Sequence, residues 1–421
     1  MKDMRRTKLD GWFEFYRIAC PICGHAGGCM QHVDGEAIVC IRVKSETPFS
    51  KNSSLPSYIH YLKGDKKRKK INVDEIPIYQ GEPKKNDSFL HEVYKAFIDC
   101  LDLEESHYQH LISPSRQLTD EQIRERGYRS FPQQPWNIVK DIADITGIED
   151  FSGVPGFFEA EGKYGQYWSI QGMEGILIPF RNHKNEVVGF QYRIDNPPND
   201  VKVQERKQGI RATVIKQPNM VQVSFDGEVL FEREFEMGKT ETIMHNSDIL
   251  GWVTLKKGNR YFWLSSANKN KGTGSGNPAP VHISVPTARL KDWETGETLK
   301  ARTVWLSEGP IKTDIASDLI EKVFDPQELF VVGDTFLALP GANSWRLALP
   351  ILKEMEVDEV NLCFDADVVS NPYVRQHLME CAKELKKEGY SANMVIWNQS
   401  DGKGIDDLLL NNKVPHFKRL F

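Results

Sequence analysis

The sequence predicts a multidomain α/β protein with a cysteine-rich N-terminal module, a mixed α+β middle domain carrying a β-rich insertion, and a C-terminal domain built on a parallel sheet. Three observations lead to this prediction. Four of the seven cysteines lie within the first 40 residues. Residues 199–258 contain short alternating segments separated by turns, which is typical of β-strands. Near the C-terminus, apolar runs alternate with segments of helical spacing, as in parallel sheets covered by helices.

Length and composition set the limits of this organisation. The 421 residues suffice for about two to four domains. We place them at residues 1–60, 88–300 and 301–421, with a linker at 61–87. A hydrophobic content of 40% and a charged content of 27% are typical of globular proteins. No apolar run approaches the roughly 18 residues of a membrane span, and no signal-peptide pattern follows the basic N-terminus, so we expect a cytoplasmic protein without membrane contact.

The clustered cysteines predict a structural zinc site. A Cys-x-x-Cys knuckle is followed by two further cysteines at spacings that suit a small ribbon. An odd total of cysteines, bunched in this way, indicates metal binding in a reducing compartment rather than a disulfide framework. The four candidate ligands are Cys20, Cys23, Cys29 and Cys40. His25 or His32 could replace Cys29, and a metal-free or redox pair is the alternative to zinc.

Basic and aromatic residues around the cysteines suggest nucleic-acid binding at this module. The net charge of -5 gives no global nucleic-acid signal, so any such binding must come from local patches. Aromatic rings with interleaved cations can stack bases and follow a phosphate backbone, although a small module also needs aromatics for its core. The residues concerned are Trp12, Phe13, Phe15, Tyr16, Arg17, Arg42 and Lys44. The basic run at residues 64–70 is expected to be a solvated linker, with phosphate binding as the alternative.

The middle domain is expected to begin with helices and continue with a hairpin. A helical pattern starts at Ser88, and Thr119 opens a capping box of a helix that ends at Gly127. Residues 175–181 and 186–193 predict two strands joined by a turn, and residues 260–266 a further strand. The insertion at 199–258 contains Gly-Lys-Thr at 238–240, but the preceding glycine of a P-loop is missing, so nucleotide hydrolysis of that type is not expected.

Acidic residues follow two of the predicted C-terminal strands. Glu308 ends the first apolar run, and Asp365 and Asp367 follow the second. Residues 329–332 and 394–397 supply two further β-like runs. Because ligands bind beyond the carboxyl ends of parallel strands, we expect these acids to converge there, where a divalent cation such as magnesium would relieve their repulsion. The alternative is that such acids, Asp367 in particular, are helix N-caps or solvated loop residues.

These acidic motifs resemble those of Toprim domains, the catalytic cores of bacterial-type DNA primases, some topoisomerases and some nucleases. Glu308-Gly309 and Asp365-x-Asp367 match the first two motifs, and residues 401–408 look like the closing segment, with Asp406 as a further magnesium ligand and Lys403 as a phosphate-binding residue. The resemblance covers roughly residues 303–411. It departs from the family at Lys312, where many primases have aspartate; the nearest acid is Asp314.

The order of zinc ribbon, strands and Toprim-like core is similar to that of bacterial and phage primases. In those proteins a hairpin and a following strand supply basic residues to the catalytic cleft. Arg193 matches the terminal arginine of the hairpin, and Arg260 stands where the family usually has lysine. The resemblance therefore implies a DNA primase of phage, plasmid or mobile-element type. It would use single-stranded DNA template, ribonucleoside triphosphates and Mg²⁺ or Mn²⁺, with Lys312 neutralising phosphates. Because the chain ends soon after the core and lacks a P-loop, we expect a separate replicative helicase. A Toprim-type nuclease and a non-catalytic, zinc-dependent single-strand binder are the alternatives.

Overall fold

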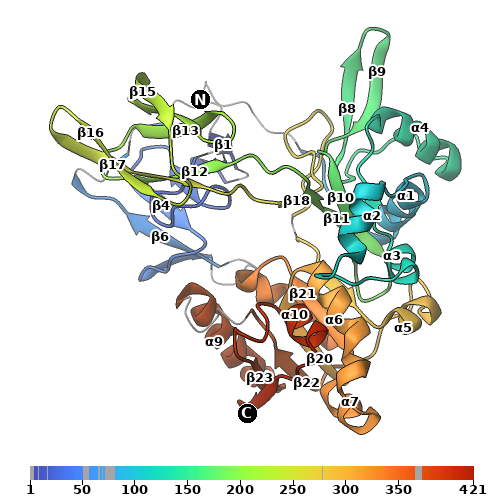
Figure 1. The fold of residues 1–421 in the computed structure, drawn as a ribbon. Coiled ribbons are helices and arrows are strands. Elements are labelled where there is room, and N and C mark those ends of the chain that lie inside the picture. Colours follow the sequence, from blue (N-terminus) through green and yellow to red (C-terminus); the bar gives the residue numbers. More distant parts are fainter. Residues whose placement is uncertain are drawn as a thin grey trace. The chain divides into compact units, whose positions relative to one another are not determined.

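The computed structural model describes residues 4–7, 9–16, 18–50, 56–64, 67–68, 70–71, 81–276, 278–365 and 372–421, with only the backbone at 372 and 373. The chain forms two compact units (Figure 1). The first combines Met1–Gln80 with Asn196–Arg260, and the second combines Gly81–Asp195 with Tyr261–Phe421. The β-rich segment therefore shares a unit with the cysteine-rich segment. Our four-part division by residue number stays a prediction.

The N-terminal part of the first unit is an antiparallel sheet of six strands in the order β1-β2-β3-β4-β6-β5. Inward-facing side chains alternate along β2, where Phe13 and Phe15 are buried. They pack with Ile38 and with the cysteines of the cluster, so the small core depends on the cysteine site. The strands are β1 (Met4–Arg6), β2 (Trp12–Phe15), β3 (Met30–His32), β4 (Ala37–Cys40), β5 (Thr47–Ser50) and β6 (Ser57–Tyr61).

The predicted β-rich segment consists of two three-stranded antiparallel sheets, β12-β17-β16 and β13-β14-β15. Alternating apolar residues from both sheets form one core, which includes Val221, Val223 and Val253. The strands expected at 201–203, 213–215, 221–223 and 229–231 are all present. Their bounds are β12 (Asp200–Glu205), β13 (Ile210–Lys216), β14 (Met220–Phe225), β15 (Glu228–Glu234), β16 (Thr240–His245) and β17 (Asp248–Lys256).

Arg68 differs from the expectation that the basic run is solvated. Its guanidinium lies 5.6 Å from the ring centroid of Phe15 and donates hydrogen bonds to Gln31 (2.9 Å) and to Glu205 of β12 (2.8 Å). Only 10% of the side chain is exposed. Arg68 therefore connects the cysteine-containing sheet with the β-rich segment inside the first unit, a contact between residues far apart in sequence that composition could not reveal.

The second unit begins with helices on an antiparallel sheet of order β18-β11-β10-β7. The predicted hairpin is confirmed as β10 and β11, and the capping box at Thr119 is confirmed with both of its hydrogen bonds. The helices are α1 (Asp87–Asp99), α2 (Glu105–Ile112), α3 (Asp120–Arg126) and α4 (Pro135–Thr146). The strands are β7 (Arg129–Ser130), β8 (Phe157–Gly162), β9 (Gly165–Ile170), β10 (Gly175–Arg181), β11 (Val187–Ile194) and β18 (Tyr261–Trp263).

The C-terminal part of the second unit is a six-stranded sheet of order β19-β21-β20-β22-β23-β24. The pairs β20·β21, β20·β22 and β22·β23 are parallel, and the two outer pairs are antiparallel. Its strands are β19 (His282–Ser284), β20 (Thr303–Glu308), β21 (Thr335–Leu339), β22 (Glu359–Leu362), β23 (Ser391–Ile396) and β24 (His416–Arg419). Its helices are α5 (Thr287–Asp292), α6 (Pro310–Val323), α7 (Pro326–Val332), the 3₁₀ helix η3 (Ala342–Leu347), α8 (Ala348–Glu354), α9 (Pro372–Lys387) and α10 (Ile405–Leu410).

The β-like run expected at residues 329–332 is wrong: these residues belong to helix α7. Asp325 forms a capping box with Glu328, and Pro326 occupies the first helical turn, so the local start signals outweigh the β propensity of the valines. The strand between β20 and the edge of the sheet is β21 instead, a fully buried apolar segment. The run at 394–397 is largely confirmed as the end of β23.

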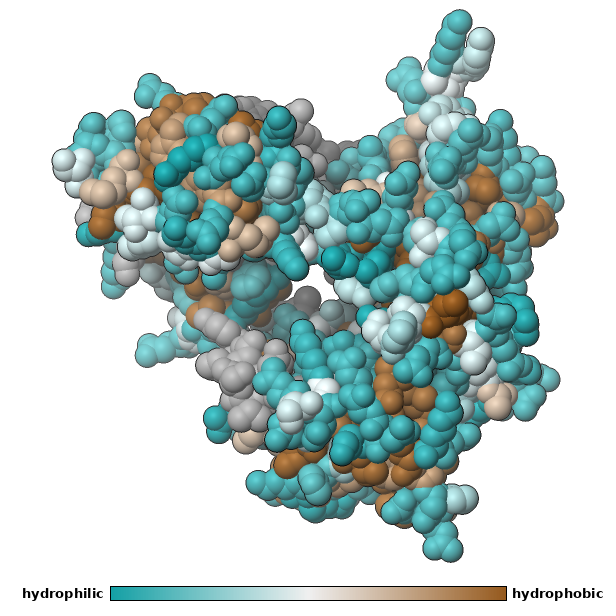
Figure 2. Space-filling view, viewed as in Figure 1, coloured by the Kyte–Doolittle hydropathy of each residue, from teal (hydrophilic) through white to brown (hydrophobic). Residues whose placement is uncertain are grey.

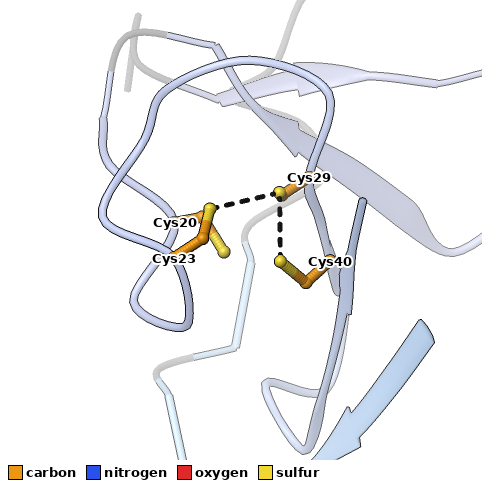
Figure 3. Close-up of side chains that lie close together, drawn as sticks. All are labelled: Cys20, Cys23, Cys29 and Cys40. Atoms are coloured by element: carbon orange, nitrogen blue, oxygen red, sulfur yellow. Dashed lines mark hydrogen bonds between the residues drawn. The ribbon is translucent and has the colours of Figure 1, made fainter. Parts of the chain in front are cut away.

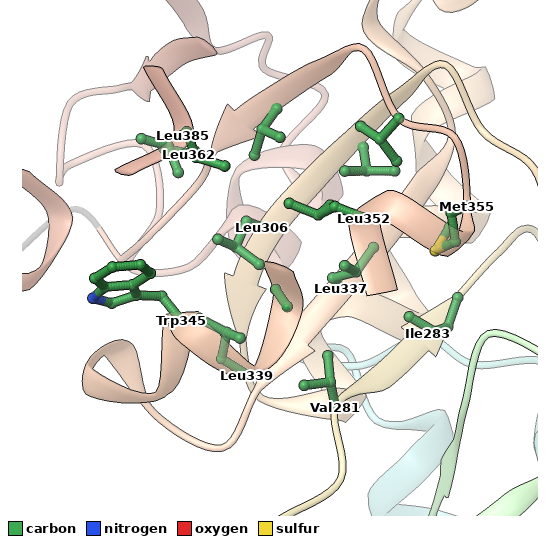
Figure 4. Close-up of a cluster of buried hydrophobic side chains, with 14 of the residues drawn as sticks. Val281, Ile283, Leu306, Leu337, Leu339, Trp345, Leu352, Met355, Leu362 and Leu385 are labelled. Atoms are coloured by element: carbon green, nitrogen blue, oxygen red, sulfur yellow. The ribbon is translucent and has the colours of Figure 1, made fainter. Parts of the chain in front are cut away.

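The sheet has a hydrophobic cluster on each face. One cluster includes Leu306, Leu337 and Trp345 (Figure 4), and the other includes Trp305 and Phe336. Alternate residues of β20 thus face opposite clusters, as expected for a strand buried on both sides. Hydrophilic residues cover most of the visible molecular surface (Figure 2). In the part of the chain that the structure describes, no helix combines the length and apolar character needed to cross a bilayer.

A buried ionic network joins helix α3 to helix α6. Asp314 accepts hydrogen bonds from Arg126 (2.6 Å) and from the hydroxyl of Tyr128 (2.5 Å), and His282 Nε2 lies 3.0 Å from the same carboxylate. Burial opposes ionisation of Asp314, but the charge of Arg126 outweighs it and holds the pKa of Asp314 below its usual value. Arg126 also pairs with Asp318 at 2.7 Å.

We expect Arg126→Met to destabilise the second unit by about 3–5 kcal/mol, because it leaves two carboxylates buried without their counter-ion. Denaturant unfolding followed by helical circular dichroism measures the loss. Arg124→Met is the matched control, since Arg124 lies in the same helix with 64% of its side chain exposed. Equal stability of the two variants would show that the network contributes nothing to the fold.

Candidate functional site

The four cysteines of the N-terminal module lie close together (Figure 3). Cys20 and Cys23 belong to the turn after β2, Cys29 precedes β3, and Cys40 ends β4. The sulfur of Cys29 lies 3.7 Å from that of Cys23 and 3.7 Å from that of Cys40, and all four sulfurs lie within 4.8 Å of one another. A tetrahedron with Zn–S bonds of about 2.3 Å has sulfurs about 3.8 Å apart. The cluster therefore has the size and ligands of a structural zinc site.

Hydrogen-bond donors surround these sulfurs. The backbone N–H groups of Arg42 and Val43 point to the sulfur of Cys40 at 3.4 and 3.2 Å. The guanidinium of Arg42 lies 3.6 Å from the sulfur of Cys29. Because such donors stabilise thiolate over thiol, they favour the ionised form that binds metal. In the sequence, Arg42 is recognisable only as a possible nucleic-acid contact.

The two histidines weighed as replacements for Cys29 lie outside the cluster. His25 Nδ1 is 2.7 Å from the carbonyl oxygen of Cys23, and His32 Nδ1 is 2.8 Å from Asp34. Among the described residues, the four cysteines are the one group of at least three such side chains whose ligand atoms lie close enough to share a metal ion. Cys29 is thus the fourth member of the cluster.

A second candidate site lies at the carboxyl edge of the parallel strands. Glu308 is the last residue of β20, and Asp365 follows β22. Gly309 between β20 and α6 adopts a φ of 80°, which favours glycine and lets the chain turn directly into the helix. Lys312 in the first turn of α6 reaches both carboxylate oxygens of Asp365, at 2.6 and 2.7 Å.

Helix α10 contributes Asp406 to this region. Asp406 has 2% of its side chain exposed and pairs through Oδ2 with Arg116 at 3.0 Å. Its other oxygen, Oδ1, is buried and has no hydrogen-bond partner among the described residues. A Cβ on Gly404 would lie 2.4 Å from this Oδ1 and 3.3 Å from the Cδ of Lys312, so a side chain at position 404 would displace Asp406. Arg116 carried no signal in the sequence, because it lies in a loop far from the acidic motifs.

The positive charge of Lys312 offsets part of the negative charge of the acidic residues at this site. Burial lowers the pKa of Lys312, but the charge of Asp365 and then those of Asp406 and Glu308 outweigh it, so the net pKa is raised. Burial raises the pKa of Asp406, and Arg116 and Lys312 only partly offset this effect. The ammonium of Lys312 is therefore paired with Asp365 and is attracted more weakly by Asp406 and Glu308.

The structure describes some of the predicted acidic site residues, places one of them elsewhere and leaves one out. Asp367 lies outside the described residues, as does Arg17. Asp314, the acid nearest to Lys312 in sequence, belongs to the buried network with Arg126 rather than to the site. No three acidic side chains described at this edge have ligand atoms within 4.8 Å of one another. The magnesium role of Glu308, Asp365, Asp367 and Asp406 stays a prediction.

Three residues predicted to bind phosphate, Arg193, Arg260 and Lys403, differ in their exposure to solvent. Arg193 lies half-buried in β11 opposite Tyr261 of β18, and Arg260 is exposed directly before β18. Lys403 is exposed, and its backbone N–H donates to Asp407 at 3.2 Å, within the cap of helix α10. These side chains are thus available to solvent, and their binding role stays a prediction.

Comparison with known proteins gives distant matches. A family model described as "Domain of unknown function (DUF3854)" matches residues 332–415, and no curated protein matches the chain. The chain is similar to the Aquifex aeolicus primase (zinc binding and RNA polymerase domains), with 11% identity over 97% of this chain and 81% of that one, at a TM-score of 0.40. It is also similar to the RNA polymerase domain of Mycobacterium tuberculosis primase DnaG, with 15% identity over 77% and 80%, at 0.40. These values are low, so the function proposed below depends on the residues of the site.

Proposed function

We propose that the protein is a DNA primase of phage, plasmid or mobile-element type, with an N-terminal zinc ribbon and a C-terminal Toprim core. The observation that carries the proposal is the pairing of Lys312 with Asp365 at the carboxyl edge of the parallel strands β20 and β22, where Glu308 ends β20. A four-cysteine cluster in the same chain supports it, because a zinc ribbon suits a protein that holds single-stranded template. A Toprim nuclease would use the same acids, and product analysis separates the two.

The acidic residues fit a hard divalent cation. Carboxylate oxygens are the ligands that Mg²⁺ and Mn²⁺ accept, and the buried Oδ1 of Asp406 lacks a hydrogen-bond partner among the described residues. Asp365 and Asp406, with Asp367, would hold the ion. When bound, it would supply neutralisation of the triphosphate charge.

The remaining chemistry falls to side chains of the chain itself. The carboxylate of Glu308 would accept the proton of the primer 3′-hydroxyl or serve as a further ligand. The ammonium of Lys312 would hold phosphate oxygens. Arg193 and Arg260 would bind template or nucleotide phosphates, because a guanidinium binds phosphate through two parallel hydrogen bonds.

We expect Arg193→Ala and Arg260→Ala each to weaken single-stranded DNA binding uniformly across sequences. Removing one phosphate contact should reduce the slope of log affinity against log salt by about 0.7. Fluorescence anisotropy at several salt concentrations measures both effects. Arg302→Ala is the control, because Arg302 is exposed (68%) and its nearest acid, Asp358, is 3.8 Å away. Slopes equal to that of the control would reassign both arginines as ordinary surface cations.

The direct test of the proposal is synthesis without a supplied primer. The zinc-loaded protein is incubated with single-stranded DNA, labelled ribonucleoside triphosphates and Mg²⁺ or Mn²⁺, and the products are sized. We expect short labelled RNA with either metal. Deoxyribonucleotides in a parallel reaction define the sugar preference. Shortened template without labelled product would identify a nuclease instead.

A further inference from the structure

The acidic site carries its own cation, the ammonium of Lys312. It lies within 2.7 Å of both oxygens of Asp365, so it occupies the positions from which a metal ion would bind that carboxylate through both oxygens. The pair is only partly accessible, with 29% of the Lys312 side chain and 25% of the Asp365 side chain exposed. A bidentate ion pair shielded to this degree is a strong competitor for any other cation.

The side chains of Lys312 and Asp406 both lie beside Gly404. The Cδ atom of Lys312 and the Oδ1 atom of Asp406 lie 3.3 and 2.4 Å from where a Cβ of this glycine would stand. That Oδ1 is buried and has no hydrogen-bond partner among the described residues, although Arg116 pairs with the other oxygen of Asp406. The site thus contains an unpaired acceptor oxygen, Oδ1 of Asp406, among the described residues, and a lysine, Lys312, that already pairs with Asp365.

We infer that Lys312 is an internal counter-ion that exchanges partners: it neutralises Asp365 in the free protein, and it moves to a phosphate of the nucleotide when a divalent ion takes Asp365. The inference rests on the proposed function. Its physical basis is that a divalent ion taking Asp365 would leave the partly shielded ammonium without its anion, and a triphosphate arriving with its metal supplies another. Metal and nucleotide binding are therefore coupled through Lys312.

This exchange predicts opposite effects of one substitution on two ligands. Lys312→Met keeps most of the methylene chain but removes the charge. Without the competing ammonium, Mn²⁺ alone should bind at least about tenfold more tightly. Without the phosphate partner, a fluorescent ribonucleoside triphosphate at saturating Mn²⁺ should bind about tenfold more weakly. A lysine that merely supports the fold would weaken both.

The experiment measures Mn²⁺ binding by electron paramagnetic resonance and nucleotide binding by fluorescence, both on the full zinc-loaded chain. Lys312→Arg should keep both affinities near those of the parent, because it retains the charge. Lys322→Met is the matched control, an exposed lysine of the same helix. Lys312→Gln repeats the charge removal with a polar side chain, in case the methionine variant does not fold.

The outcomes separate this inference from the proposed function. Tighter Mn²⁺ and weaker nucleotide binding in the charge-removing variants supports the exchange. If the two affinities do not move in opposite directions while Asp365→Asn still abolishes Mn²⁺ binding, the exchange is overturned and the metal site stands. Mn²⁺ binding that is indifferent to Asp365→Asn overturns both.

Discussion

Replacing Asp365 with asparagine, or Glu308 with glutamine, should lower the rate of primer synthesis by about 10²–10⁴ while leaving the fold intact. Asparagine keeps the shape of aspartate but removes the charge that binds metal, so Asp365→Asn should also lower metal affinity. Asp365 lies in a loop after β22, and its partner Lys312 is partly exposed to water, so the fold does not depend on this carboxylate. Asp367→Asn should behave in the same way if the sequence prediction of its role is right.

The glutamate variant distinguishes two roles for Glu308. If its carboxylate is a general base, Glu308→Gln stays slow even at saturating metal. If it is only a ligand, raising Mn²⁺ restores much of the rate. Synthesis and single-strand cleavage should be measured side by side, with Glu321→Gln on the exposed face of α6 as control. Full synthesis in the Glu308, Asp365 and Asp367 variants alike would refute the site.

Removal of zinc should unfold the N-terminal sheet. Structural zinc contributes about 10–16 kcal/mol of apparent binding free energy in small zinc modules, and here the cysteines are themselves core residues beside Phe13 and Phe15. We expect one zinc per chain by elemental analysis, and its loss in a Cys20→Ser, Cys23→Ser double variant. Trp12 of β2 is half-buried, and chelation should expose it further to solvent. A change in the tryptophan fluorescence of the chain measures this exposure.

A matched control for the zinc experiment is Cys100→Ser, because Cys100 lies in the second unit outside the cluster. This variant should keep its zinc and its fluorescence. A parent protein without zinc, or a double variant with undiminished zinc, would show that the four cysteines form a metal-free cluster.

Much of the fold could be predicted from local sequence signals. The capping box at Thr119, the hairpin of β10 and β11 and the short strands of residues 199–258 each depend on residues near one another in the chain. The cysteine cluster could also be predicted from the sequence, because the spacing of a Cys-x-x-Cys knuckle limits how far apart its ligands can lie. Helix α7 was missed because its capping box and proline outweigh the β propensity of its last residues.

Contacts between distant residues explain what the sequence could not reveal. Arg68 was assigned to a solvated linker, although it packs on Phe15 and pairs with Glu205. Arg116 meets Asp406 only because the loop after α2 and helix α10 belong to one unit. The sequence also marked Lys312 as a departure from the Toprim pattern, but its bidentate pairing with Asp365 is a property of the folded chain.

The measurement that tests the central claim most directly is the sequence of the RNA made on defined templates. Parent protein and Asp365→Asn are incubated separately with single-stranded DNAs of different sequence, all four ribonucleoside triphosphates and Mn²⁺, and the products are sequenced. We predict short RNAs complementary to each template from the parent and at least about a hundredfold less from the variant. Absence of complementary RNA from the zinc-loaded parent, or equal amounts from both proteins, would contradict the assignment of a primase site at Asp365.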